Sequence, residues 1–238
     1  MTMASRKVIC ALDTGSIDEA VQAVERLSGH IHAFKVGHGL VLPYGLDLIE
    51  RLREAGASRI FLDLKFHDIP NSVALAVREA ARHKVWMMTL HNTGGPAMLT
   101  AAVEEAQCYP ETERPILVGV SVLTSIDQHI LTDHIGVGRS VSEQVTFLSQ
   151  RAIECGLDGV VCSPNEVRAV RETIGHDGCI VTPGIRRPDQ ADGGHARFGL
   201  AEQAIADGAD YLVIGRGLMS ALDPAEALAQ YGLGTPVA

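Results

Sequence analysis

Several patterns that mark broad classes of protein are absent from this sequence. The 20 Lys and Arg are outnumbered by 29 Asp and Glu over 238 residues, and neither sign forms long runs. Without a basic stripe the chain has no surface for following the phosphate backbone of nucleic acid. The longest apolar stretches, such as residues 116–120, fall far short of the ~20 residues of a membrane helix. We therefore expect neither a nucleic-acid partner nor a membrane span.

Signals for secretion, metal binding and nucleotide cofactors are also missing. Residues 1–7 lack the apolar core of a secretory signal, so we expect a cytoplasmic protein. The ten histidines include no His-Glu-x-x-His and no pairing with cysteine at zinc spacing, which predicts no metal. There is no Gly-x-Gly-x-x-Gly or Walker loop, so no dinucleotide or NTP cofactor is expected. We interpret the five cysteines, an odd number without a Cys-x-x-Cys pair, as reduced core residues: Cys10, Cys108, Cys155, Cys162 and Cys179.

Short apolar runs alternate with segments of helical period along the whole chain. This alternation predicts a parallel sheet covered by helices. The eight strand candidates are Lys7–Asp13, His32–Gly37, Arg59–Lys65, Val85–His91, Ile116–Leu123, Gly159–Ser163, Cys179–Pro183 and Tyr211–Gly215. Eight units favour a closed (β/α)8 TIM barrel over an open doubly wound sheet. No linker or change of composition divides the chain, so we predict one domain over residues 1–238.

In such barrels the reactive groups lie at the C-terminal ends of the strands. Asp63 and Lys65 end the third strand candidate, and side chains two apart share a face, so both should point into the barrel while Leu64 faces the helices. With Lys35 from the second strand, the site would alternate cation and anion. Mutual pairing would keep these groups ionised and fix a lysine as a proton donor. A purely structural ion pair between Asp63 and Lys65 is the alternative.

Two further regions extend the candidate site. Asp68 lies beyond the third strand, just before Pro70, where it could cap the next helix or reach another subunit. Gly215 and Arg216 end the eighth strand candidate, and Arg186 follows the seventh. The loops after strands seven and eight often bind phosphate in this fold, and arginine supplies bidentate donors. The sequence therefore predicts a phosphate site there.

The segment Asp-Leu-Lys-Phe-His-Asp-Ile-Pro-Asn, residues 63–71, closely resembles the signature of bacterial orotidine 5'-phosphate decarboxylases. Other segments that match the family fall in the family's order, at residues 11–13, 34–37, 91–95, 122–125, 182–186 and 214–216. The resemblance spans nearly the whole chain. It implies cofactor-free decarboxylation of orotidine 5'-monophosphate (OMP) to uridine 5'-monophosphate (UMP) and carbon dioxide, the last step of de novo UMP synthesis, by a homodimer with shared active sites.

The resemblance also implies a role for individual residues. Lys65 would protonate C6 of the pyrimidine, Asp63 would lie beside the substrate carboxylate, and Lys35 would connect them to the ribose. Residues implied to act in the partner's active site are Asp68, Ile69 and Ser72. The other implied substrate-binding positions are Asp13 at a ribose hydroxyl, Thr124 at the pyrimidine edge, Pro183 at the end of the seventh strand, and Arg186, Gly215 and Arg216 at the phosphate.

Two departures from the family pattern concern substrate binding. The family has a phosphate-binding Gln where this chain has His195, so either His195 or Gln190 would replace it. Ser72 stands for the usual Thr and keeps the hydroxyl. The role of His91 stays open. Two rival functions remain: a magnesium-dependent decarboxylase or aldolase of ketose phosphates with a similar Asp-x-Lys-x-x-Asp core, and a non-catalytic phosphosugar-binding barrel.

Overall fold

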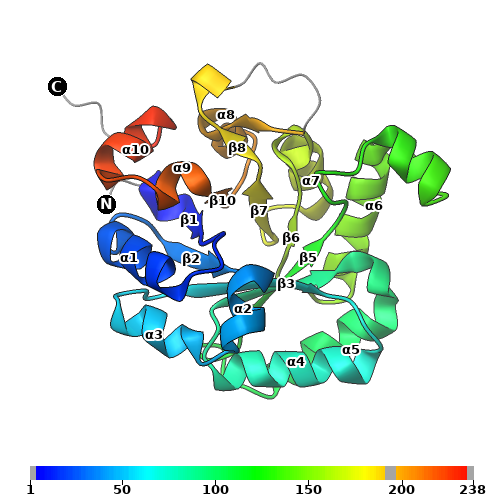
Figure 1. The fold of residues 1–238 in the computed structure, drawn as a ribbon. Helices are drawn as coiled ribbons and strands as arrows, with labels where there is room; N and C mark the ends of the chain where they lie inside the picture. Colours follow the sequence, from blue (N-terminus) through cyan, green and yellow to red (C-terminus); the bar gives the residue numbers. More distant parts are fainter. Residues whose placement is uncertain (1–3, 191–196, 235–238) are drawn as a thin grey trace.

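Eight parallel strands form a closed barrel in the computed structural model, which describes residues 4–190 and 197–234. The strands are β1 (Val8–Ala11), β2 (Ala33–Val36), β3 (Ile60–Phe66), β4 (Met87–His91), β5 (Ile116–Val120), β6 (Gly159–Val161), β7 (Cys179–Pro183) and β10 (Tyr211–Ile214). Each pairs with its neighbour along the barrel, and β1 pairs with β10 to close it (Figure 1). The predicted (β/α)8 barrel is confirmed. The single-domain extent over residues 1–238 stays a prediction.

The helices surround the barrel on its outside (Figure 1). They are α1 (Ile17–Leu27), α2 (His38–Tyr44), α3 (Leu48–Glu54), α4 (Pro70–Arg82), α5 (Gly95–Gln107), α6 (Val141–Glu154), α7 (Val167–Ile174), α8 (Ala201–Ala206), α9 (Arg216–Met219) and α10 (Pro224–Gln230). In α1, Ser16 accepts a hydrogen bond from the Glu19 N–H and so caps the helix. The apolar residues of α1 recur at helical spacing and are buried: Ile17, Ala20, Ala23, Val24 and Leu27.

A second, two-stranded sheet lies beside the barrel. It consists of β8 (Ile185–Arg186) and β9 (Gly199–Leu200), which pair in parallel. Strand β8 follows β7 directly and carries Arg186, one of the predicted phosphate-binding residues. The sequence did not predict this sheet, because two-residue strands carry no periodicity that could indicate them.

The interior of the barrel is a packed core, and not a pore. Its buried apolar side chains are Ile9, Ala11, Ala33, Phe61, Met87, Val118, Val181 and Val213. At the N-terminal end of the strands, His32 packs between Trp86 and Tyr211, with ring centroids 5.0 and 5.1 Å away. Partial burial, reinforced by the charge of Arg59, lowers the pKa of His32 to about 4. The barrel is therefore closed at this end and open at the other.

The cysteines are free, but not all of them belong to the core. Cys10 and Cys162 are buried, whereas Cys108 is exposed. The core interpretation is wrong for Cys108, because this residue caps the C-terminal end of α5 at the surface. Burial raises the pKa of Cys10 to about 12. None of the helices in the described part of the chain has the length and apolar character that crossing a membrane requires.

Candidate active site

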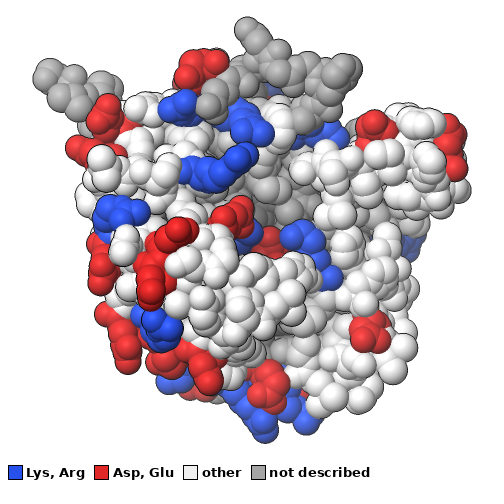
Figure 2. Space-filling view, viewed as in Figure 1, with Lys and Arg blue, Asp and Glu red and all other residues white. Residues whose placement is uncertain are grey.

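A cavity of about 990 Å³ opens at the C-terminal ends of the strands. Most of the residues that the sequence predicts for the site line it: Asp13, Lys35, Asp63, Lys65, Thr124, Pro183, Arg186, Gly215 and Arg216. Figure 2 shows basic and acidic side chains side by side in the hollow at the centre of this face. The cavity therefore lies at the end of the barrel where the TIM-barrel rule expects reactive groups.

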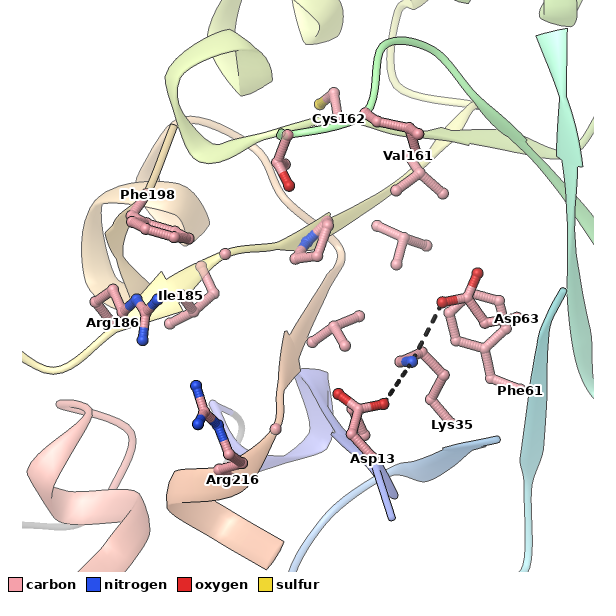
Figure 3. Close-up of a pocket in the computed structure, with 18 of the residues that line it drawn as sticks. Asp13, Lys35, Phe61, Asp63, Val161, Cys162, Ile185, Arg186, Phe198 and Arg216 are labelled. Atoms are coloured by element: carbon pink, nitrogen blue, oxygen red, sulfur yellow. Dashed lines mark hydrogen bonds and ion pairs between the residues drawn. The ribbon is translucent and has the colours of Figure 1, made fainter. Parts of the chain in front are cut away.

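Four charged side chains form a continuous array along one wall of the cavity. The Lys35 Nζ lies 3.2 Å from Asp13 Oδ1 and 3.2 Å from Asp63 Oδ2. The Lys65 Nζ lies 2.9 Å from Asp63 Oδ1. Figure 3 shows Lys35 between the carboxylates of Asp13 and Asp63. The order Asp13, Lys35, Asp63, Lys65 gives the alternation of charges that the sequence predicts, with Asp13 as an additional member.

The array keeps its buried members ionised. Burial alone would lower the pKa of Lys35, but the charges and hydrogen bonds of Asp63 and Asp13 outweigh it and raise that pKa above its ordinary value. Burial would likewise raise the pKa of Asp63, but Lys35 and Lys65 outweigh it and hold that pKa below its usual range. The centre of the array is therefore the Asp63 carboxylate, held between the Nζ atoms of Lys35 and Lys65.

Thr89 on β4 is a member of the site that the sequence did not reveal. Its side chain is buried, and its hydroxyl donates to Asp63 Oδ1 over 3.0 Å. The same hydroxyl oxygen accepts the Lys65 backbone N–H over 2.8 Å. Lys65 has a positive φ of 51°, a left-handed conformation that is uncommon for residues other than glycine. Thr89 thus fixes both the carboxylate and the turned backbone that aims the Lys65 side chain.

Because the backbone is irregular at Lys65, simple strand alternation does not explain why Asp63 and Lys65 both face the cavity. The pairing of β3 with β4 shifts register between Leu62 and Phe66. Asp63 and Lys65 therefore share the cavity in a strand that departs from regular alternation there. Leu64 packs on the core between barrel and helices, as predicted.

The other end of the cavity carries two arginines without acidic partners. Arg186 comes from β8, and Arg216 begins α9 directly after Gly215. Within residues 4–190 and 197–234, no carboxylate forms an ion pair with either guanidinium. Figure 3 shows both side chains extending into this end of the cavity.

Three predicted residues lie outside this cavity. Asp68 and Ile69 line a separate, shallow groove between the start of α4 and the start of α5, and Ser72 lies in the first turn of α4. The alternative in which Asp68 caps α4 is wrong: its carboxylate accepts the N–H of Ile69 over 2.6 Å, and no side chain caps that helix. The Asp68 side chain is exposed.

Two residues, His195 and Gln190, are the candidates to replace the phosphate-binding Gln of the family. His195 lies outside the described residues. Gln190 is the last residue of a 3-10 turn, Pro188–Gln190, and of this residue only the backbone is described. His91 ends β4, with its ring 5.4 Å from that of His67 and its Nδ1 buried without a partner among the described residues. Burial and the neighbouring charges of His67 and Lys65 lower the pKa of His91.

Three further side chains at the arginine end were not predicted from the sequence. Arg187, Phe198 and Tyr231 all line the cavity. Arg187 forms an ion pair with Asp189 over 3.3 Å and donates to Gln230 over 2.9 Å. Tyr231 follows α10 and reaches the site from the C-terminal part of the chain. Spacing alone could not indicate them, because the barrel brings them together from distant segments.

The arrangement combines two lysines paired with carboxylates at one end with two guanidinium groups at the other that have no acidic partner among the described residues. It is suited to a substrate with a phosphate at one end and a centre that gains a proton at the other. Among the described residues, no group of three or more His, Cys, Asp or Glu side chains is placed to hold a metal ion.

Comparisons with known proteins point to one family. The model of the orotidine 5'-phosphate decarboxylase / HUMPS family matches residues 6–231. The orotidine 5'-phosphate decarboxylase of Moorella thermoacetica is 42% identical over 227 residues, which cover 94% of this chain and 90% of that protein. The same-named protein of Actinobacillus succinogenes is 43% identical over 222 residues, 93% of this chain and 94% of that protein. The crystal structure of orotidine 5'-phosphate decarboxylase from Lactobacillus acidophilus superposes with a TM-score of 0.82 at 34% identity, covering 95% of this chain and 97% of that chain.

Proposed function

Because the chain belongs to the orotidine 5'-phosphate decarboxylase / HUMPS family, we propose that it decarboxylates OMP to UMP in pyrimidine biosynthesis, with Lys65 as the proton donor. The single observation that carries this proposal is the ion array in which Asp63 lies 3.2 Å from Lys35 and 2.9 Å from Lys65. In this reading the pyrimidine lies over the array and the phosphate lies between Arg186 and Arg216.

The chemical step needs no electron acceptor outside the substrate. The bond between C6 and the carboxylate breaks, its electron pair stays on C6, and neutral carbon dioxide leaves. The Lys65 ammonium then gives its proton to C6, which becomes C6–H, and the lysine regains a proton from water. Asp63 supports this role because its carboxylate, 2.9 Å from the Lys65 Nζ, holds that group in place at the wall of the cavity.

The rate enhancement rests on preorganised charge. A carbanion without a cofactor is so unstable that the barrier must fall toward the upper part of the range of about 8–23 kcal/mol that enzymes reach. An ammonium held in place by a buried carboxylate stabilises the developing negative charge without reorganisation during the reaction. The substrate carboxylate beside Asp63 would also be repelled, and this repulsion is relieved when carbon dioxide forms.

Phosphate binding at the far end contributes to the same step. The free guanidiniums of Arg186 and Arg216 would form charge-assisted hydrogen bonds with the phosphate dianion. Asp13 lies between the two ends, 3.2 Å from Lys35, where it could accept a ribose hydroxyl. Thr124, in the loop after β5, would contact the pyrimidine edge. Binding energy from the phosphate can then be used to orient the base over Lys65.

The test is the ultraviolet assay for loss of OMP, run with and without EDTA. We expect full turnover in the chelator. Activity that appears only with added magnesium would favour the magnesium-dependent rival, which acts on ketose phosphates. The names of the relatives favour OMP, but the assay decides for this chain.

We also propose that the protein is a homodimer in which Asp68 completes the partner's site. Asp68 is exposed and absent from the walls of its own cavity, and its neighbour Ile69 is 66% exposed although it is apolar. Leu75, on the α4 helix that follows Ile69, is also apolar and 46% exposed. An apolar, exposed rim next to an acidic side chain is the surface expected where a second copy docks.

Mixing two inactive variants tests the shared site. Lys65→Ala and Asp68→Ala subunits are each expected to have little activity as pure dimers. In a mixed dimer, one of the two sites receives Lys65 from one chain and Asp68 from the other. Random mixing in equal amounts should restore about a quarter of the wild-type activity. No recovery in verified mixed dimers would contradict sharing of the site.

A further inference from the structure

The Arg186 side chain is held by an aromatic ring, and not by a carboxylate. Its guanidinium carbon lies 4.0 Å from the ring centroid of Phe198. Its side chain forms no hydrogen bond or ion pair with any residue in the described part of the chain. Figure 3 shows the Phe198 ring beside the Arg186 guanidinium. Stacking on a ring face restricts the guanidinium but leaves the N–H groups at its edge free.

The backbone that carries the ring is paired with the backbone that carries the arginine. In the two-stranded sheet, Arg186 of β8 lies opposite Leu200 of β9, and Ile185 lies opposite Gly199. The Gly199 N–H donates to the Gly184 carbonyl over 3.1 Å. Phe198 immediately precedes β9, so this pairing fixes its position relative to Arg186.

A buried ion pair holds the chain on the other side of Phe198. The Arg197 Nε and Nη2 donate to the two carboxylate oxygens of Glu166, over 3.1 and 2.7 Å. Both side chains are largely buried, with 13% and 7% exposed. The Arg197 Nη1 also donates to the Leu123 carbonyl over 3.2 Å. Phe198 thus lies between Arg197 and Gly199, which are both held by hydrogen bonds, and this fixes the position of its ring.

We propose that Phe198 is a positioning residue that orients the Arg186 guanidinium toward the substrate phosphate. The inference rests on the proposed function, in which Arg186 binds that phosphate. Phe198 acts through Arg186 and needs no contact with the reacting atoms. Its effect should therefore appear only with ligands that carry the phosphate.

The chain offers a matched control. The Arg139 guanidinium carbon lies 4.0 Å from the ring centroid of Phe147 on α6, and neither residue lines the cavity. Phe147 and Phe198 are both partly buried. Replacing either ring by leucine removes the same kind of arginine contact, but only Phe198 lies at the substrate site.

The experiment measures inhibition of OMP turnover by UMP and by uridine, which lacks the phosphate. For Phe198→Leu we expect the Ki of UMP to rise about 3-fold to 30-fold, the range for loss of a cation–π contact, with an unchanged Ki for uridine. Phe198→Tyr keeps the ring face and should bind UMP within about 2-fold of wild type. Phe147→Leu should change neither Ki. In an Arg186→Met background, Phe198→Leu should have no further effect on UMP.

Distinct results separate failure of this inference from failure of the proposed function. An unchanged Ki of UMP in Phe198→Leu, beside a raised Ki in Arg186→Met, overturns the positioning role and leaves the proposed function intact. Equal rises for UMP and uridine also overturn it, because they indicate a general packing role. No turnover of OMP by the wild-type protein would remove the proposed function, and this inference with it. If Phe198→Leu melts early, Phe198→Met provides the same comparison with an unbranched side chain that fills irregular gaps more readily.

Discussion

At the scale of single residues, the reactive end of the cavity depends on groups that fix one another. Asp63 is paired with Lys35 and Lys65, and the Thr89 hydroxyl connects its carboxylate to the Lys65 backbone. The left-handed backbone at Lys65 is stable only because such contacts hold it. Removing one of them should therefore affect the chemistry more than its own contact energy suggests.

Replacing Thr89 by valine tests this dependence. The change keeps the shape but leaves the Lys65 N–H without its acceptor. We expect kcat/KM for OMP to fall about 10-fold or more, and the free energy of unfolding to fall by about 1–3 kcal/mol. Thr182→Val is the control, because the Thr182 hydroxyl is equally buried and has no partner in the described chain. Equal effects of the two substitutions on kcat/KM would contradict the role given to Thr89.

The sequence indicates the charged residues of the site better than their supports. Asp63 and Lys65 stand out because two charges end an apolar strand. Thr89 does not, because one threonine in Met-Met-Thr-Leu is an ordinary strand residue. Asp68 was open between two roles, since a residue before a helix can cap it or face outward. The structure decided against the cap through the Ile69 N–H.

At the scale of elements, the eight barrel strands could be predicted and the short elements could not. Buried parallel strands are continuous apolar runs, and helices between them show a period of 3.6 residues. Several predicted strands extend past the observed ends, because apolar residues continue into the loops: β5 ends at Val120, not at Leu123. The small sheet of β8 and β9 depends on contacts between distant segments, so no local pattern could indicate it.

We expect the ion pair between Glu166 and Arg197 to stabilise the segments around the small sheet of β8 and β9. Arg197→Met leaves the buried Glu166 carboxylate without its cation, and we expect the free energy of unfolding to fall by about 3–5 kcal/mol. Urea denaturation measures the change. The control is Arg82→Met, which removes an exposed guanidinium from the exposed carboxylate of Glu79 and should have little effect. Similar losses in both variants would show that burial does not set the strength of the pair.

At the scale of the whole molecule, the barrel separates its functions between its two ends. The C-terminal ends of the strands carry the charge array and the arginines, whereas the N-terminal ends are closed by the rings of His32, Trp86 and Tyr211. Conditions that disturb the closed end should therefore affect stability without acting directly on the chemistry.

His32 should make the stability of the protein depend on pH. Its pKa falls from an ordinary 6.5 to about 4 on folding, so between these values the unfolded chain binds a proton that the folded chain excludes. The contribution of neutral His32 to the free energy of unfolding is therefore complete above pH 6.5 and is lost as the pH falls toward 4. Thermal melts from pH 7 to 4.5 should show a smaller decline for His32→Phe than for wild type. If His30→Phe, at an exposed position, gave the same flattening, the effect would not belong to His32.

The central claim is that Lys65, held by Asp63, protonates the product carbanion. The most direct test is the rate of OMP decarboxylation by Lys65→Ala beside wild type in EDTA, with UMP binding as the check that the site is intact. We expect kcat to fall by at least about 10²- to 10⁴-fold, the usual contribution of a positioned proton donor, with UMP still bound. Turnover within about 10-fold of wild type would contradict the account, because the step would then not need the lysine at the centre of the site.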